Sequence, residues 1–354
     1  MPSGPTPSGP VPLVRQAGGH FAMGRQHGAA RAAALRAFLD DGTARLAHLM
    51  TGPVSWDGLR AAVAGYRAET ERQTPDLAAE VRGLAAGADL SEDEAWLLQS
   101  RRELLGYHKV PTLGDCTTYA RAGEAAWHGP VLAQTVDLNG DLDDVIAVLD
   151  VAPAGGRRVL VLSFGGLLGY LGVNEDGLAV GINLVLGGDW RPGLPPYLAV
   201  RHLLERAGTV AEALDVLAGL RLASSRSLTL CDPRASAWVE VLGDDIRAVR
   251  SDAHVHTNHF LHPDFAARDE LNVFARNSSL RRREACLAAL ERRPGADPEE
   301  HFAVLSAPPV CVSGTGDIRR ERTVAAAVML PARRELRIRP GDPSRAATQV
   351  FRLT

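Results

Sequence analysis

The chain has 354 residues, of which 45% are hydrophobic and 23% charged, and its formal net charge is −3. These values are typical of a globular protein that can bury a sizeable core. The 39 basic and 42 acidic residues nearly balance, so the charge gives no general attraction to nucleic acid or anionic lipid. No apolar run reaches the roughly 18 residues that a membrane-spanning helix needs, which excludes such helices.

Residues 1–20 begin with Pro, Gly and Ser in quick succession. They lack the positively charged start and long apolar stretch of a secretory signal, so we expect a flexible arm and a cytoplasmic location. The cysteines Cys116, Cys231, Cys286 and Cys311 are widely spaced and include no CxxC pair. This spacing argues against a disulfide framework and against a cysteine-rich zinc site.

Residues 21–115 are predicted to be helical, because apolar residues recur there at helical spacing. Ser91 is followed by three acidic residues, a combination typical of a helix start. Nothing before Pro111 alternates in the manner of a strand. The helices are predicted over residues 25–50, 56–72, 76–86 and 91–106.

After Pro111 the pattern changes to short apolar runs bounded by Gly, Asp and Asn, which indicate strands. Strands are predicted at 116–120, 131–136, 145–150, 158–164, 168–173, 178–185, 227–231, 236–242, 246–250, 254–259, 322–330 and 335–339. Helices are predicted at 196–207, 210–219, 278–291 and 298–306. This order predicts an α+β protein with two antiparallel sheets and helices outside them. No glycine fingerprint of a nucleotide-binding fold accompanies it.

Cys116 begins the first predicted strand directly after Gly114 and Asp115. One interpretation is structural, because cysteine packs well as a small buried residue. The other is that its thiol is a nucleophile. A thiol with a pKa of about 8.5 needs a neighbouring base to act as a nucleophile at neutral pH.

Cys116-Thr117-Thr118 belongs to a series of short motifs in a characteristic order. The others are GRQHG at 24–28, QTVD at 134–137, GVNEDGL at 172–178, TNHF at 257–260 and RTV at 322–324. Together they resemble the cysteine Ntn hydrolases, and within them the autoprocessing acyl-coenzyme A:6-aminopenicillanate (isopenicillin N) acyltransferases, peptidase family C45. The resemblance spans about residues 20–345.

The resemblance implies an αββα sandwich, with two antiparallel sheets between helical layers. It also implies a precursor that cuts itself between Asp115 and Cys116, with Thr117 assisting. Residues 21–115 would then become a small helical chain, and residues 116–354 a large chain that forms the core.

The resemblance also assigns catalytic roles. The α-amino group freed at Cys116 has an ordinary pKa of about 7.7–8.0, so it can take the thiol proton and return it to the leaving group. Asp137 would orient that amine, Asn258 would donate to the oxyanion, and Arg322 would hold Asp137 or favour the thiolate. The product of this step is an S-acyl enzyme.

Phe164 and Tyr170 are candidates to line an acyl pocket. The expected partners are a small-molecule amide or thioester donor, such as an acyl-coenzyme A, and an amine acceptor. No cofactor, metal, nucleic acid or membrane is expected. The same residues would serve an amide hydrolase that uses water as the acceptor, and a non-catalytic binding protein of this fold is a further alternative.

A different alternative rests on four histidines close together. His254, His256, His259 and His262, with Asp264, contain an HxH pair that would place two imidazoles on one face of a strand. This pattern would suit a zinc hydrolase.

Asp115 departs from the family pattern, in which Gly commonly precedes the cysteine. Gly adopts the positive φ that helps the thiol attack the preceding carbonyl, whereas a carboxylate disfavours a nearby thiolate. We therefore expect cleavage to be slower, and more dependent on pH, than with Gly at position 115.

Overall fold

The computed structural model describes residues 9–106, 116–126, 128–292 and 297–353. Its larger sheet has the order β1-β4-β5-β6-β7-β8-β9-β10, and its smaller sheet the order β11-β2-β3-β12-β13-β14. The larger sheet contains β1 (Leu13–Gly18), β4 (Ile146–Pro153), β5 (Val159–Phe164), β6 (Leu171–Asn174), β7 (Ala179–Leu184), β8 (Arg226–Cys231), β9 (Ser236–Leu242) and β10 (Asp245–Arg250). The smaller sheet contains β11 (Ala253–His256), β2 (Cys116–Arg121), β3 (Val131–Leu138), β12 (Arg322–Leu330), β13 (Glu335–Pro340) and β14 (Gln349–Arg352).

Helices flank both sheets. They are α1 (His20–Asp40), α2 (Gly42–Leu49), α3 (Trp56–Gln73), α4 (Pro75–Ala88), α5 (Glu92–Leu105), α6 (Pro196–Arg206), α7 (Val210–Ala218), α8 (Pro263–Ala266), α9 (Val273–Glu291) and α10 (Pro298–Ser306). None of those described is long and apolar enough to cross a membrane.

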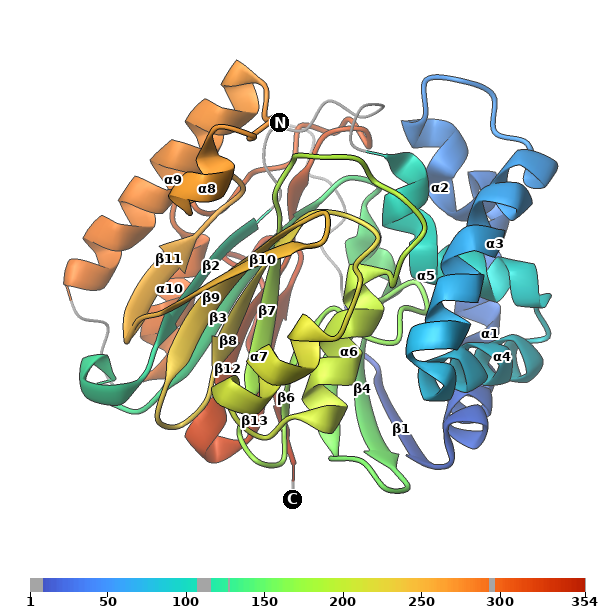
Figure 1. The fold of residues 1–354 in the computed structure, drawn as a ribbon, viewed down its shortest axis with the longest axis horizontal. Helices are drawn as coiled ribbons and strands as arrows, with labels where there is room; N and C mark the ends of the chain where they lie inside the picture. The colour runs from blue at the N-terminus through green and yellow to red at the C-terminus, as the bar shows by residue number, and fades with distance from the viewer. Residues whose placement is uncertain (1–8, 107–115, 127, 293–296, 354) are drawn as a thin grey trace.

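The two sheets pack face to face, because β2 and β3 contact β7 and β8. Helix α6 packs on β5, β6 and β7 of the larger sheet, whereas α9 and α10 pack on β2, β3, β11 and β12 of the smaller one. Figure 1 shows the resulting layers, with α6 and α7 on one side and α9 and α10 on the other. The predicted αββα sandwich is confirmed.

The central strands are buried on both faces. Every residue of β3 and β5 is buried, because a sheet covered on both sides leaves neither face to water. This explains why the sequence shows continuous apolar runs there rather than strict alternation.

One strand lies where a flexible arm is predicted. β1 pairs in parallel with β4, with Val14 opposite Leu149 and Gln16 opposite Val151. The sheets are therefore antiparallel except at this edge. The buried positions of β1 are Val14 and the polar Gln16, so its alternation is hidden in the sequence.

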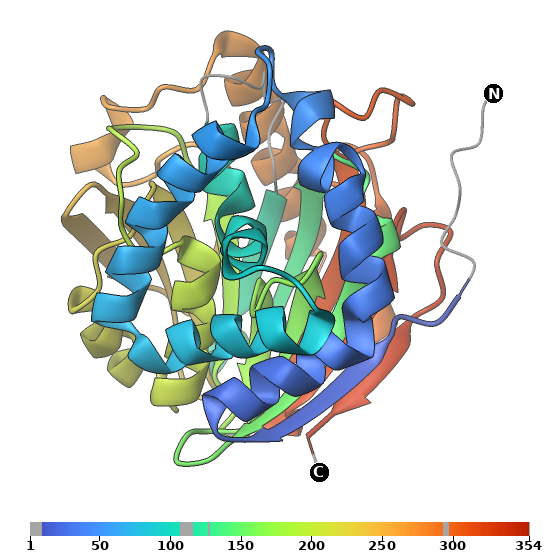
Figure 2. The same ribbon diagram turned by 90° about the vertical axis from the view of Figure 1, so that its right-hand side faces the viewer.

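Helices α1 to α5 cover one end of the sandwich, where Figure 2 shows them in blue to cyan. α1 and α4 cross at very short range through glycines. A Cβ atom on Gly24 would lie 1.9 Å from the carbonyl oxygen of Glu80, and one on Gly83 would lie 2.1 Å from that of Phe21. The GRQHG motif thus supplies a close helix contact.

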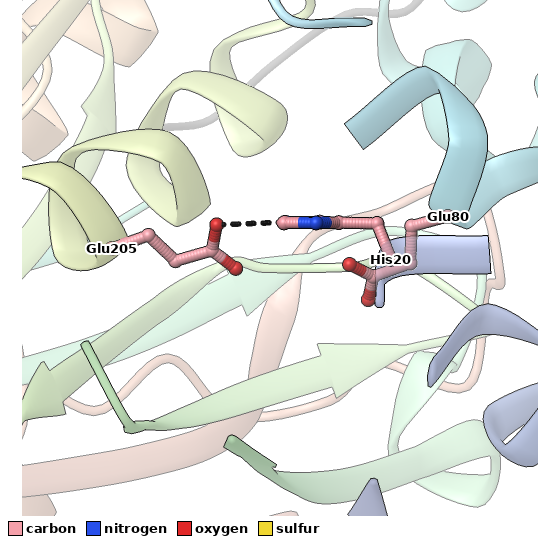
Figure 3. Close-up of side chains that lie close together, drawn as sticks. All are labelled: His20, Glu80 and Glu205. Carbon is pink, nitrogen blue, oxygen red and sulfur yellow. Dashed lines mark hydrogen bonds and ion pairs between the residues drawn. The ribbon is translucent and has the colours of Figure 1, made fainter. Parts of the chain in front are cut away.

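A buried ion cluster joins this helical segment to the core. Arg201 of α6 donates to both carboxylate oxygens of Glu80 of α4, at 3.1 and 3.0 Å, and also to Glu205. Glu205 in turn bonds His20 at the start of α1, over 3.0 Å. Figure 3 shows Glu205 and His20 joined, with Glu80 beside them. Charges from α1, α4 and α6 therefore balance one another inside the protein.

Candidate active site

Cys116 is the first residue of β2 and is 1% exposed. It lies opposite Val136 of β3, and its Sγ is 3.7 Å from Oη of Tyr170. The other cysteines are also free thiols. Burial raises the pKa of Cys286 and of Cys311 to about 12, so these two thiols stay protonated and unreactive at neutral pH.

Asn258 contacts the main chain of Cys116 directly. It follows β11, which pairs with β2 so that His256 lies opposite Thr118. Its Oδ1 accepts the Cys116 N–H over 3.3 Å, and its Nδ2 donates to the carbonyl oxygen of Leu184 over 2.9 Å. The amide is therefore oriented by a donor on one side and an acceptor on the other.

Arg282 of α9 completes this arrangement and is absent from the predicted site. Its side chain is fully buried. It donates to the carbonyl oxygen of Cys116 at 2.6 Å, to Oγ1 of Thr117 at 3.0 Å and to Oδ1 of Asn258 at 2.6 Å. One guanidinium thus holds both the start of β2 and the Asn258 amide.

Arg282 is hidden in the sequence within an Arg-Arg-Arg run, which is typical of a solvated surface. A signal does exist, since the buried residues of α9 are Ala275, Ser279, Arg282, Cys286 and Leu290. This spacing of three or four residues places Arg282 on the apolar face of the helix.

Asp137 is fully buried on β3. Its Oδ1 accepts from the Thr323 hydroxyl at 2.7 Å, and its Oδ2 accepts from the Thr135 hydroxyl at 3.4 Å. The Thr135 hydroxyl also accepts the N–H of Thr117 over 3.1 Å. Strand alternation places Asp137 on the face opposite to the Cys116 side chain, so Asp137 is linked to the start of β2 through Thr135.

Arg322 has partners other than the expected one. It donates to Asp141 at 2.7 Å and to Asp143, and these carboxylates keep its pKa raised although burial acts to lower it. It makes no ion pair with Asp137 in the structure. The reason is local: Arg322 lies opposite Leu138 at the end of β3, next to the turn that carries both aspartates.

A pocket lies close to the cysteine, and both predicted lining residues, Phe164 and Tyr170, contribute to it. Tyr170 stacks on Tyr197 with ring centroids 4.7 Å apart. Arg101 and Asn139 also line the pocket. The walls are thus mainly apolar and aromatic, and the polar atoms are few.

His256, His259 and Asp264 of the alternative zinc site have separate partners. His256 bonds Glu240 over 2.8 Å, His259 bonds Ser279 over 2.8 Å, and Asp264 pairs with Arg247. These residues bring no metal-binding set together within the described part of the chain. A set with suitable spacing there is His20, Glu80 and Glu205, whose carboxylates already bond Arg201.

Two residues of the predicted cleavage site, Gly114 and Asp115, lie outside the described residues. The predicted cleavage therefore stays a prediction.

Comparisons with known proteins agree with the motifs. A family model described as acyl-coenzyme A:6-aminopenicillanic acid acyl-transferase matches residues 126–345. A curated relative, the acyl-coenzyme A:6-aminopenicillanic-acid-acyltransferase 40 kDa form of Emericella nidulans, is 26% identical over 207 residues. That match covers 57% of this chain and 57% of the relative, so the chain spans little more than half of the relative's length.

Solved structures of similar outline include penicillin V acylase from Agrobacterium tumefaciens, with a TM-score of 0.48 and 17% identity over 67% of this chain and 86% of that one. Another is the Caenorhabditis elegans orthologue of N-acylethanolamine-hydrolyzing acid amidase. Its TM-score is 0.45, with 17% identity over 68% of this chain and 100% of that one. The family model covers most of this chain, including Asp137, Asn258, Arg282 and Arg322, and begins ten residues after Cys116. The chain belongs to the acyl-coenzyme A:6-aminopenicillanic acid acyltransferase family.

Proposed function

We propose that the chain is an acyltransferase or amide hydrolase that carries the acyl group on the thiol of Cys116. The observation that carries this proposal is the hydrogen bond from the Cys116 N–H to Oδ1 of Asn258. The nitrogen that would become the catalytic amine already has an acceptor. The Tyr170 hydroxyl and the adjoining pocket lie on the thiol side.

The first step of the proposal is self-cleavage. Sγ of Cys116 attacks the carbonyl carbon of Asp115, and the C–N bond between the two residues breaks as a thioester forms. Water then opens the thioester, which leaves a carboxylate on Asp115 and a free amine on Cys116. The small chain of residues 1–115 stays attached through buried contacts such as the Arg201–Glu80 pair.

In the catalytic cycle the free amine takes the proton from Sγ as sulfur attacks the carbonyl of an amide or thioester donor. The protonated amine then passes that proton to the leaving nitrogen or sulfur as the bond breaks. An acceptor amine or water attacks the S-acyl group and gives its proton to the Cys116 amine. The C–S bond then breaks, the acylated product leaves, and the Cys116 sulfur takes the proton back from the amine. The two reactions differ only in the acceptor.

The surrounding residues would stabilise the charges that develop during these reaction steps. The Asn258 amide carries two hydrogens, and one points to Leu184. We assign the second to the oxyanion, an interaction typically worth about 2.7–4 kcal/mol. Arg282 is a positioning residue, because it fixes Asn258 and the start of β2. Asp137 would favour the protonated amine.

The test begins with intact-mass spectrometry of the purified protein. Two chains that end at Asp115 and start at Cys116 are expected from the wild type, and one uncut chain from Cys116→Ala. Incubation with an activated acyl donor should add one acyl group to the large chain. Release of that group by an added amine identifies a transferase, and release by water alone a hydrolase. An uncut wild-type chain that still turns over substrate would overturn the N-terminal-amine mechanism.

A further inference from the structure

Arg101 carries a buried charge that no carboxylate of the described residues neutralises, although its guanidinium lies over the ring of Phe38, 5.7 Å from the centroid. Its Nε donates to the carbonyl oxygen of Ala44 at 2.6 Å, while its buried Nη2 has no hydrogen-bond partner. Among the described residues it forms no ion pair. Burial, reinforced by the charges of Arg102 and Arg45, lowers the pKa of Arg101 to about 9. A guanidinium in this setting is stabilised by an anion.

A second donor without a partner lies on the same pocket. Asn139 is 5% exposed, and its buried Nδ2 has no partner. It precedes Gly140, where an added Cβ atom would lie 2.9 Å from Nη2 of Arg101. Nη2 of Arg101 therefore lies against the backbone next to Asn139, and both residues line the pocket. Buried donors are almost always satisfied in folded proteins, so two of them on one pocket point to a ligand that accepts hydrogen bonds.

The pocket has the complementary features of a site for an amphiphilic anion. Its lining contains no Asp or Glu among the described residues, and its walls are chiefly Leu and aromatic side chains. Tyr170 lines the pocket, and its hydroxyl oxygen lies 3.7 Å from the Cys116 sulfur. A ligand would thus have an apolar body, an anionic end, and a carbonyl near Cys116.

We propose that Arg101 and Asn139 determine specificity by receiving a carboxylate of the substrate, joined by an apolar spacer to the carbonyl that Cys116 attacks. The proposal rests on the proposed function for the chemical step, but binding of the anion does not depend on it. A carboxylate matches the planar guanidinium and accepts from Asn139 as well. Because Arg101 lies on α5, the helical segment ahead of Cys116 would form part of the substrate site.

Kinetics with matched substrates test the preference. The probes are straight-chain acyl p-nitroanilides of equal length that end either in a methyl group or in a carboxylate. The wild type should favour the carboxylate series at one optimal chain length. Arg101→Met should lower the ratio of kcat/KM between the two series by about tenfold or more, since the receptor for the charge is lost. Arg101→Lys should retain part of the ratio.

The ratio is taken within one preparation, so the amount of correctly folded enzyme cancels. Leu98→Ala is the matched control, because Leu98 lines the same pocket without a polar group. It should change the preferred chain length and leave the charge preference intact. An unchanged ratio in Arg101→Met would overturn the assignment.

Binding provides a readout that needs no turnover. Straight-chain carboxylic acids should raise the melting temperature of the wild type more than the corresponding primary amides, and Arg101→Met should remove this difference. Equal shifts from acid and amide in the wild type, or larger shifts from alkyl phosphates, would overturn the carboxylate site. If acids bind through Arg101 but no anilide is cleaved, the proposed function fails and the anion site stands. If anilides are cleaved without any preference for the carboxylate series, the proposed function stands and the anion site fails.

Discussion

Arg282 donates to Oδ1 of Asn258 over 2.6 Å, and the Cys116 N–H donates to the same oxygen over 3.3 Å. A side chain from α9 therefore fixes how the Asn258 amide faces the start of β2. This relationship connects the outer helical layer with the proposed nucleophile, and it explains why a fully buried arginine is present there.

Asn258→Ala should lower kcat by about 10²–10³ with a modest change in KM, as expected for a donor used mainly in the transition state. Arg282→Met should lower kcat as well, because the amide loses the charge that orients it. Arg282→Lys should recover part of the rate. Rates are to be normalised to the fraction of cleaved chains, determined by mass spectrometry. Unaltered kcat in Asn258→Ala would remove this residue from the oxyanion hole.

Cys116→Ala should abolish both acylation and cleavage, whereas Cys286→Ala should retain activity. The physical reason is that burial raises the pKa of Cys286 to about 12, so it carries almost no thiolate at neutral pH. Labelling with a thiol-directed acylating probe, followed by peptide mapping, identifies the reactive cysteine. Activity lost in Cys286→Ala and kept in Cys116→Ala would refute the assignment.

Asp115→Gly should speed self-cleavage and reduce its pH dependence. A glycine permits the strained backbone that the attack requires, and it removes a carboxylate that disfavours the thiolate. Chain cleavage is to be followed on gels from pH 5 to 9, with Cys116→Ala as the uncleaved control. Equal rates for the wild type and Asp115→Gly at every pH would show that Asp115 has no influence.

Stability should depend on the protonation of His20. Burial acts to lower the pKa of His20, but the hydrogen bond and charge of Glu205 outweigh it and raise the pKa above 6.5. The extra stability is therefore complete below about pH 6.5 and is lost as the pH rises through the folded-state pKa. His20→Gln should cost about 1.5–3 kcal/mol of unfolding free energy at pH 6, as for a hydrogen bond to a charged group, and less at pH 9.

Urea unfolding of the uncut Cys116→Ala chain measures this effect without separating two chains. The control is His48→Gln in the same background, since His48 pairs with Asp41 on the surface and such pairs contribute little. A pH profile unchanged by His20→Gln would show that the buried cluster is insensitive to His20.

Much of the fold follows from sequence pattern. The strands of the core and the helices ahead of Cys116 occur near their predicted positions, because long apolar runs and helical spacing are strong signals. β1 was missed because Gln16 occupies a buried position. β14 was missed because it is a short strand at the edge of its sheet, paired with β13 alone.

The candidate site was only partly predictable. The structure places Asn258 against Cys116, and it places Phe164 and Tyr170 in one pocket. The catalytic and binding roles assigned to these residues stay predictions. Arg322 pairs with nearby aspartates instead of Asp137, since side-chain partners across a turn depend on loop geometry that local sequence does not encode. The sequence alone does not single out Arg101, because the reason for proposing a role is that its buried Nη2 has no hydrogen-bond partner in the folded chain.

The parallel pairing of β1 with β4 has a consequence for the order of events in making the protein. The larger sheet includes a strand from before position 116, so the sheet is complete only when both parts of the polypeptide are present. A chain expressed from Cys116 onwards would expose the free edge of β4, and open edges of this kind favour aggregation. If the chain is cut before Cys116 as proposed, the larger sheet would have to assemble before the cut, because the segment ahead of Cys116 supplies β1.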